Sequence, residues 1–339
     1  MPTLDIFNDD AFSLRGLTLA MQNVPYQPRM ISSLGLFNES GVTSNLMQIE
    51  QRGTTLSLIS AKPMGVPGRP ETKDKSKLIP IATVHLPQRD SVTAAEVQGV
   101  RAFGTESEVA TVQALVNRQL TKMRNNIDAT IEWQRIGAIK GQVLDADGST
   151  VLMDMFTTFG LTQQTVAMAL TTDATKVKLK VTAAMRLAEQ KLGGIMTRGY
   201  LAICGKDFFD ALVTHPVVEA AYNRWLDGAF LRDVQRGQDS VASAGFPYAG
   251  VAWREYSGEV SGQKFVGDDD AYLVPMGVQD MFQTRYSPAD YMETVNTVGL
   301  PYYAKQERMD FDKGVEIETQ SNPINFNSRP DAVIKLAKV

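Results

Sequence analysis

One stripe of apolar residues constrains the fold of this chain more than any other feature, because it requires a single long helix. Between residues 109 and 131 the apolar positions recur at steps of three and four, and they are Val109, Val112, Val116, Leu120, Met123, Ile127 and Ile131. This spacing places all of them on one face of an α-helix. Thr105 and Glu108 match a capping box, and Gly141 is a suitable stop. The pattern predicts a helix over residues 105–136, about 48 Å long at 1.5 Å per residue.

A coiled-coil seam is the alternative interpretation of this stripe. Its steps form an 11-residue repeat, which is not a heptad, and the repeat occurs only twice. We therefore expect one long helix that crosses the face of a sheet.

Two strand-like segments precede the helix. Residues 47–60 alternate in part between apolar and polar positions, and the return segment contains the apolar and proline residues Ile79, Pro80, Ile81, Val84 and Pro87. Proline is confined to the edges and bulges of sheets, so we expect a narrow ribbon. Because a free two-stranded ribbon is marginal in water, this one needs a surface to lie on.

The insert between these segments, KPMGVPGRPETKDKSK at 62–77, cannot fill a core. It holds three prolines, five basic residues and two acidic ones, which gives it a net charge of +3 on a chain whose net charge is −4. The prolines reduce the entropy that the loop would lose on docking. We expect a stiff basic tip that is attracted to acidic patches on neighbouring molecules, and a solvated loop is the alternative.

The first 46 residues are weakly patterned. Their apolar side chains are too many for a free tail, and they include Phe7, Phe12, Leu34, Leu36 and Phe37. We expect an extended arm that packs on something else, and a frayed terminus is the alternative.

After the helix, Asp147-Gly148 predicts a tight hairpin. From about residue 174 the pattern changes to mixed α/β. It predicts an amphipathic helix closed by Gly193-Gly194, a buried strand at 199–205, and one or two helices broken near Pro216. Three strands are expected between 248 and 277, and three more in the tail.

Composition limits the class of protein. The 339 residues are 43% hydrophobic, enough for a core without disulfides. The net charge of −4 argues against a protein that binds nucleic acid over its whole surface. Cys204 is the only cysteine, which excludes an intramolecular disulfide and fits a reducing cytoplasm. The acidic start does not resemble a signal peptide, and no apolar run approaches the ~20 residues of a membrane span.

No catalytic or metal motif is evident. His85, His215 and Cys204 lack the context of a nucleophile with its base, and neither phosphate-binding nor dinucleotide-binding glycine motifs occur. Asp145, Asp147 and Gly148 match the start of a calcium loop, but Phe156 stands where the distal glutamate is required. Asp268, Asp269 and Asp270 are expected to form a solvated turn rather than a metal site. We expect no enzyme and no cofactor.

The order of these segments resembles the lambda-type major capsid protein E family of tailed phages, which has the HK97-like fold. The likeness spans nearly the whole chain and rests on order and combination rather than on one signature. It is carried by residues 24–59 (VPYQPRM to LSLI), 203–225 (ICGKDFFDALVTHPVVEAAYNRW), 246–258 (FPYAGVAWREYSG), 269–290 (DDAYLVPMGVQDMFQTRYSPAD) and 318–336 (ETQSNPINFNSRPDAVIKL).

The resemblance implies an α+β capsid fold with a defined domain order. Its expected parts are an N-arm (1–46), an extended E-loop hairpin that lies across a neighbouring subunit (47–88), a peripheral domain with the spine helix and the Asp147-Gly148 hairpin (89–164), an axial domain (165–294) and C-terminal strands of the peripheral domain (295–339).

The resemblance also implies a function. The chain would be the major capsid protein of a tailed double-stranded DNA bacteriophage, made in the host cytoplasm, and would form pentamers and hexamers of the icosahedral head in the virion. A scaffolding protein, a portal and a decoration protein would be further partners, and packaged DNA would lie inside without sequence-specific binding. Alternatives are an encapsulin-like shell of a cellular compartment and a hydrolase of unknown type. Candidate contacts between subunits are Leu34, Phe37, Arg69, Lys73, Lys75 and Lys77.

Overall fold

The computed structural model describes residues 13–23, 30–51, 77–93, 96, 108–221, 246–260 and 262–339. The chain divides into two compact units. The first comprises Met1–Met47, Ile81–Gln134 and Gln283–Asn325, and the second comprises Gln48–Pro80, Arg135–Phe282 and Phe326–Val339.

The first unit is built on the long helix predicted from the apolar stripe. Helix α4 spans Glu108–Lys140, and the predicted stripe residues whose side chains are described are buried: Val116, Leu120, Met123, Ile127 and Ile131. The predicted start at Thr105 lies outside the described residues. The helix continues beyond the predicted end at 136, because Ala138 and Ile139 are also buried. It stops before Gly141, whose positive φ of 90° suits glycine.

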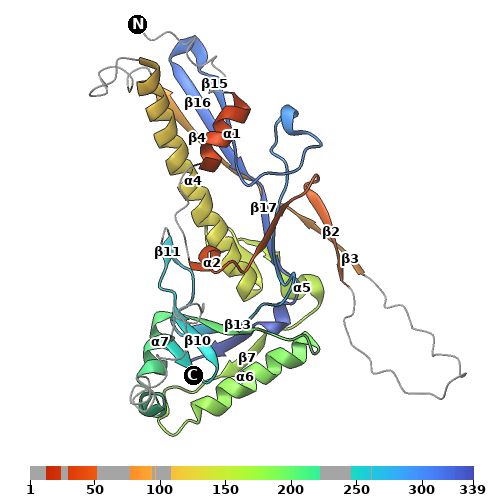
Figure 1. Ribbon diagram of the computed structural model, residues 1–339, viewed down its shortest axis with the longest axis vertical. Coiled ribbons are helices and arrows are strands. Elements are labelled where there is room, and N and C mark those ends of the chain that lie inside the picture. Colours follow the sequence, from red (N-terminus) through yellow and green to blue (C-terminus); the bar gives the residue numbers. More distant parts are fainter. Residues whose placement is uncertain are drawn as a thin grey trace, which may run out of the picture. The chain divides into compact units, whose positions relative to one another are not determined.

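A three-stranded antiparallel sheet packs with this helix (Figure 1). Its strands, in spatial order, are β15 (Tyr303–Arg308), β16 (Gly314–Ser321) and β4 (Leu86–Thr93). Ile317 on β16 and Val92 on β4 share a buried cluster with the α4 stripe. A second three-stranded sheet contains β1 (Asn38–Gly41), β14 (Phe282–Tyr286) and β17 (Pro323–Asn327), with β1 parallel to β14.

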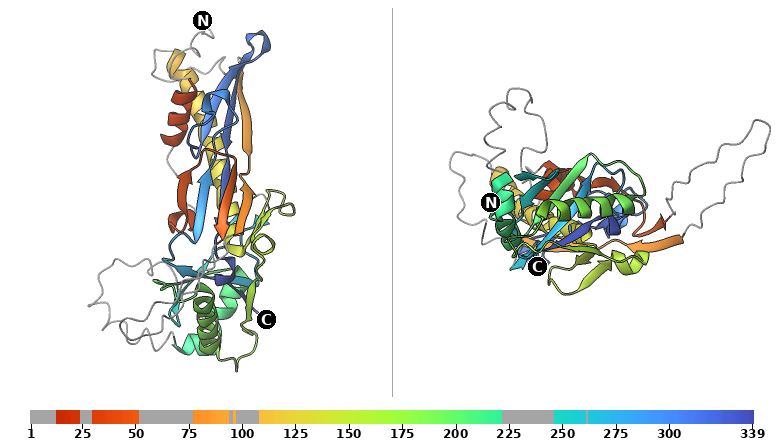
Figure 2. Two further views of the ribbon diagram at one scale, coloured as in Figure 1. Left: turned by 90° about the vertical axis from the view of Figure 1, so that its right-hand side faces the viewer. Right: turned by 90° about the horizontal axis from the view of Figure 1, so that it is seen from below.

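The N-terminal arm differs from the extended segment that we expected. It contains helices α1 (Leu14–Asn23) and α2 (Met30–Ser33) before β1. Leu17 and Met21, four residues apart, face the same side of α1 and are buried against residues of the α4 stripe. The left view of Figure 2 shows α1, in red, beside α4, in yellow. The described part of the arm therefore packs on its own subunit. Phe7 and Phe12 lie outside the described residues.

The predicted ribbon is present but shorter in its described part. Strands β2 (Leu46–Gln51) and β3 (Lys77–Ala82) form a two-stranded sheet, and 52–76 lie outside the described residues. The return segment was expected to run through Val84 and Pro87, and this expectation was wrong. The chain leaves the ribbon at 83–85, and Pro87 belongs to β4, where it lies opposite Gln320.

The second unit is centred on a six-stranded mixed sheet. Its strands, in spatial order, are β7 (Gln164–Ala167), β18 (Ile334–Ala337), β13 (Asp270–Met276), β8 (Gly199–Cys204), β10 (Val251–Glu255) and β9 (Phe246–Tyr248). Helices α6 (Val177–Leu192) and α7 (Lys206–Val213) contribute to the same core (Figure 1). Phe208 stacks on Trp253 there, and both are fully buried.

Several local predictions in this unit are confirmed. Gly193 closes α6, β8 is buried, and α7 ends at Val213 before helical backbone resumes at Pro216. One strand departs from the expected grouping. The last strand, β18, was expected beside the other tail strands, but it pairs with β7 and β13 because Ile334 and Leu336 are buried in this core.

The remaining elements are short. They are β5 (Gln142–Leu144) and β6 (Val151–Asp154) around the predicted Asp147-Gly148 turn, α5 (Met155–Phe159), β11 (Glu259–Val260), β12 (Gln263–Lys264), and the 3₁₀ turns η4 (Met292–Thr294), η5 (Asp310–Asp312) and η6 (Pro330–Ala332). More strands are present than the sequence predicted between 248 and 277 and in the tail. Among the described residues, no helix combines the length and apolarity needed to cross a membrane.

Candidate assembly surface

The β2–β3 ribbon has one covered face and one exposed face. Along β3 the side chains alternate, with Ile79 and Ile81 buried and Leu78 exposed. Leu78 is 59% exposed, and Leu46 on β2 is 57% exposed. Within the described ranges no third strand joins this sheet. A ribbon with exposed leucines and no further strand is a surface on which another molecule can pack.

The base of the ribbon is firmly held within the first unit. The Thr83 N–H donates to the Asn45 carbonyl at 3.0 Å, and the Thr83 and Ser287 hydroxyls lie 3.0 Å apart. The Val84 N–H donates to the carbonyl of Pro323 at 3.0 Å. These bonds fix the root from which the ribbon extends.

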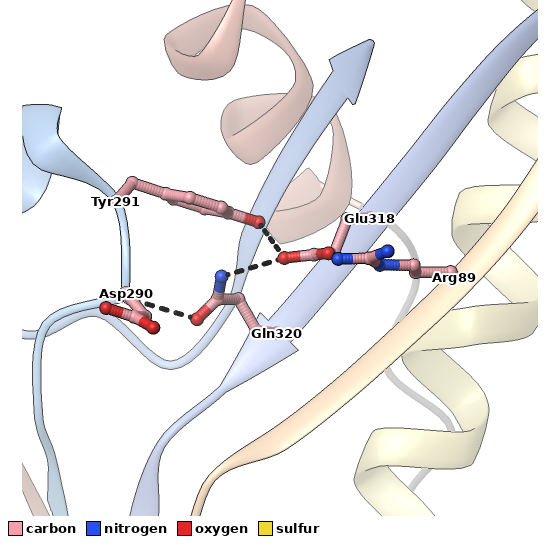
Figure 3. Close-up of polar contacts among 5 residues, drawn as sticks. All are labelled: Arg89, Asp290, Tyr291, Glu318 and Gln320. Atoms are coloured by element: carbon pink, nitrogen blue, oxygen red, sulfur yellow. Dashed lines mark hydrogen bonds and ion pairs between the residues drawn. The ribbon is translucent and has the colours of Figure 1, made fainter. Parts of the chain in front are cut away.

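A polar cluster centred on Glu318 joins three parts of the first unit (Figure 3). Arg89 on β4 and Glu318 on β16 are directly opposite in the strand register, and Arg89 Nε donates to Glu318 Oε2 at 2.6 Å. Tyr291 Oη and Gln320 Nε2 each donate to Glu318 Oε1 at 3.2 Å. The Asp290 N–H donates to Gln320 Oε1 at 3.0 Å. The cluster therefore ties the segment that carries Asp290 and Tyr291 to both strands.

The electrostatics of this cluster follow from its hydrogen bonds. The hydrogen bond to Glu318 raises the pKa of Arg89, and burial raises the pKa of Tyr291. The Tyr291 hydroxyl thus keeps its proton and remains a donor to Glu318. Because Arg89 is largely exposed, salt will screen its ion pair with Glu318.

Sequence reasoning missed this cluster. Glu316 and Glu318 alternate along the sequence, a pattern typical of a solvated strand face, whereas Glu318 is partly covered and accepts from three donors. Only the register between β4 and β16 identifies Arg89 as its partner, and no local pattern contains that register.

Three of the six predicted contact residues lie in the part of the chain that the structure describes. Leu34 is half-buried, and Phe37 is buried within its own chain. Lys77 is the first residue of β3. The other predicted contacts, Arg69, Lys73 and Lys75, lie outside the described residues. Their role between subunits stays a prediction.

The cysteine and the two histidines considered for catalysis are buried or hydrogen-bonded to other parts of the chain. Cys204 is buried, and burial raises the pKa of its thiol. Nδ1 of His215 accepts from the Val217 N–H at 3.3 Å, so Nε2 can donate to the Thr172 carbonyl, 3.2 Å away. His85 Nδ1 lies 2.7 Å from Asn322 Oδ1.

The carboxylates considered as cation ligands form hydrogen bonds and ion pairs within the chain. Asp147 accepts bonds from the backbone and hydroxyl groups of Ser149 and Thr150, and the Thr150 hydroxyl contributes most to lowering the pKa of Asp147. Each carboxylate of the predicted acidic turn pairs with a lysine: Lys264–Asp268, Lys338–Asp269 and Lys335–Asp270. In the part of the chain that is described, no group of three or more His, Cys, Asp or Glu side chains could hold a metal ion.

The sequence of this chain is similar to those of known phage capsid proteins over nearly its whole length. The family model for phage major capsid protein E matches residues 13–338. The major capsid protein of Pseudomonas phage KPP10 is 26% identical, over 96% of this chain and 96% of that protein. That of Salmonella phage Felix O1 is 25% identical, over 95% of each chain.

A crystal structure shows the same fold. It is that of a capsid protein from a prophage of E. coli CFT073, which is 12% identical and matches with a TM-score of 0.59 over 96% of this chain and 99% of that one. The long helix and the mixed α+β units agree with the HK97-like fold. The chain therefore belongs to the phage major capsid protein E family, and it is a structural protein with the HK97-like fold that forms the icosahedral head of tailed phages.

Proposed function

We propose that copies of this chain join into the pentamers and hexamers of the head shell through the β2–β3 ribbon, which docks on a neighbouring subunit. This proposal rests on the exposed face of that ribbon, on which Leu46 and Leu78 are exposed. The free energy of burying this apolar face is gained only on another surface. Repeated around a closed ring, one modest contact of this kind stabilises the whole shell.

The charge of the insert supports the same proposal. Residues 62–77 carry a net charge of +3 on a chain with a net charge of −4, so the rest of the chain is acidic. Exposed ion pairs contribute only about 0–1 kcal/mol each. Their sum over every contact in a shell becomes large, and salt weakens it by screening.

The domain assignment is part of this proposal. Residues 89–164 with 295–339 would form the peripheral domain, and residues 165–294 would form the axial domain that meets its copies around the symmetry axes. Two strands depart from these boundaries, because β18 pairs within the six-stranded sheet and β14 pairs with β1 and β17. The spine helix α4 and the sheet of β15, β16 and β4 support the first assignment. The six-stranded sheet with α6 and α7 supports the second.

Further partners are proposed on charge and on the family alone. A separate scaffolding protein, a portal and a decoration protein would act during or after assembly. The net negative charge suits a container for double-stranded DNA, because a basic lining would adhere to the packaged polymer.

The test reverses the charge of the insert. We expect Lys73→Glu/Lys75→Glu/Lys77→Glu to leave the subunit folded by circular dichroism but to reduce the yield of shells in sedimentation. The matched control is Lys176→Glu/Lys178→Glu/Lys206→Glu, which makes the same change in charge at exposed positions at the starts of α6 and α7. The electrostatic part of the proposal fails if the first variant forms shells normally at low salt.

A further inference from the structure

Helix α6, labelled in Figure 1, is the most basic of the described helices. With the lysine at its N-cap it covers residues 176–192, which carry a net charge of +4 on a chain whose net charge is −4. The basic residues are Lys176, Lys178, Lys180, Arg186 and Lys191, and the one acidic residue is Glu189. The concentration of one charge sign on a single helix indicates a surface for a partner of the opposite charge.

Most of this charge is not neutralised within the described part of the subunit. Lys191 pairs with Asp331 at 4.0 Å. The exposed cations that form no ion pair with another described residue are Lys176, Lys178 and Arg186. These three side chains can therefore meet an anionic group of another molecule.

The packing of α6 accounts for its apolar residues but not for its charge. One side of the helix is buried, and its residues are Val177, Val181, Ala184, Ala188 and Leu192. The first turn contains lysine and no acidic residue, and Lys176 forms no side-chain capping bond. The helix dipole favours anions at this end, so lysines there do not stabilise the helix. Their position is better explained by an external ligand.

The composition of the exposed side favours a phosphate backbone over a protein as that ligand. Helix α6 contains no aromatic residue, and Leu179 is its one exposed large apolar side chain. The centre of a protein interface is usually apolar and enriched in aromatic residues. Contact with phosphates needs only cations, and double-stranded DNA carries one negative charge per about 1.7 Å of its axis.

The length of the basic stretch suits this ligand. Lys176 and Arg186 are ten positions apart in the sequence. At a rise of 1.5 Å per residue this corresponds to about 15 Å along the helix, a length that spans several phosphates of a duplex.

We propose that the exposed basic side of α6 contacts the phosphate backbone of the double-stranded DNA that the shell encloses. About three phosphates are neutralised per subunit and no base is read, so the contact is weak, independent of sequence and reduced by salt. One basic helix on an otherwise acidic chain meets the DNA without binding it tightly. This inference rests on the proposed role of the shell as a container for DNA, and it identifies the surface that meets the DNA.

Binding of unassembled subunits to a fluorescently labelled DNA duplex of random sequence tests the charge requirement. The variant Lys176→Ala/Lys178→Ala/Arg186→Ala removes the three cations, and alanine preserves the helix. The logarithm of the binding constant falls with the logarithm of the salt concentration, with a slope of about −0.9 for each phosphate neutralised. We expect this slope to be shallower by about 3 in the variant than in the wild type.

The matched control is Arg118→Ala/Lys122→Ala/Lys313→Ala, which removes one arginine and two lysines from exposed positions in the first unit. It should change the slope by less than about 1. The basic insert at 62–77 is the same in both variants, so its contribution to binding is equal. Equal slopes for the two variants would overturn the inference, as would wild-type subunits that do not bind the duplex at low salt.

Acetylation of lysines in wild-type particles tests whether DNA covers α6. With N-hydroxysuccinimide acetate, Lys176 and Lys178 should react about threefold more slowly in DNA-filled particles than in empty shells, because phosphates cover them. Lys122 and Lys313 should react equally in both.

The outcomes separate this inference from the proposed function. Equal rates at Lys176 and Lys178 in filled and empty particles would overturn the inference and leave the shell function standing. Protection in particles that hold another protein but no DNA would also overturn it, and would assign the helix to an acidic protein. Chains that form no shells would instead overturn the proposed function.

Discussion

The carboxylate of Glu132 on α4 accepts a hydrogen bond of 2.7 Å from the backbone N–H of Ile31, a residue 101 positions earlier in the chain. The same carboxylate accepts from the N–H of Ser32 at 3.2 Å and from its hydroxyl at 2.6 Å. Glu132 is fully buried, and so is Ile31. One side chain thus fastens α2, and with it the N-terminal arm, to the long helix.

Glu132→Ala should loosen the arm. The change leaves buried donors without their acceptor, which costs about 1–3 kcal/mol. We expect a lower free energy of unfolding in urea and faster proteolysis near residues 30–33. The stability of Glu132→Gln, which keeps one acceptor oxygen, should fall between that of the wild type and that of Glu132→Ala. If Glu132→Ala matched the wild type in both measurements, these bonds would not hold the arm.

Ile127→Asp should prevent folding of the first unit. Ile127 is buried in the centre of the α4 stripe, and an unpaired carboxylate there costs several kcal/mol. We expect insoluble protein on expression. Asn126→Asp, at the neighbouring exposed position, is the control and should stay soluble. Soluble Ile127→Asp with the melting temperature of the wild type would contradict the burial of the stripe.

Lys140→Met should stabilise the protein near neutral pH. Burial lowers the pKa of Lys140 from 10.5 to about 8. Below pH 8 the folded state must hold a buried charge, at a cost of about 3 kcal/mol. Between about pH 8 and 10.5 the unfolded chain binds more protons than the folded one, so stability should rise with pH.

Urea unfolding of Lys140→Met across this pH range measures the effect. The variant should be more stable than the wild type at pH 7, and it should lose the rise in stability above pH 8. Lys178→Met, on the exposed side of α6, should change neither property. Equal stability of Lys140→Met and the wild type at pH 7 would show that the lysine is not penalised by burial.

Cys204→Ser and His85→Gln should both allow particles to form. Cys204 is enclosed in the core of the second unit, and His85 bonds Asn322 in the first. Because burial raises the pKa of the Cys204 thiol, a thiol reagent at pH 8 should label it only after unfolding. Shells that form but fail a chemical maturation step in either variant would reveal an active site.

Local patterns predicted the parts of the fold that local forces determine. The α4 stripe, the Asp147-Gly148 turn and the Gly193 cap each need only neighbouring residues to specify them. The arm was misjudged because the ten residues of α1 are helical through burial of Leu17 and Met21 on a distant element. The bond between Glu132 and Ile31 could not be foreseen for the same reason.

The candidate surfaces were harder to predict than the elements. The ribbon was predicted because its prolines and its insert are visible in the sequence. The Arg89–Glu318 pair depends on strand register, and the exposure of the basic side of α6 depends on what the rest of the chain leaves uncovered. Neither quantity is encoded in a short window of residues.

Pro87 has a consequence for a protein present in many copies. It lies on β4, one of the two edge strands of the sheet formed by β15, β16 and β4 in the part of the chain that is described. An open edge offers N–H and carbonyl groups to any passing strand and invites disordered aggregation. Proline has no N–H to offer, so it interrupts that row of donors. At the high concentrations of subunits that build a shell, this single residue helps to disfavour open-ended strand addition. Association is thereby directed toward contacts that close into rings.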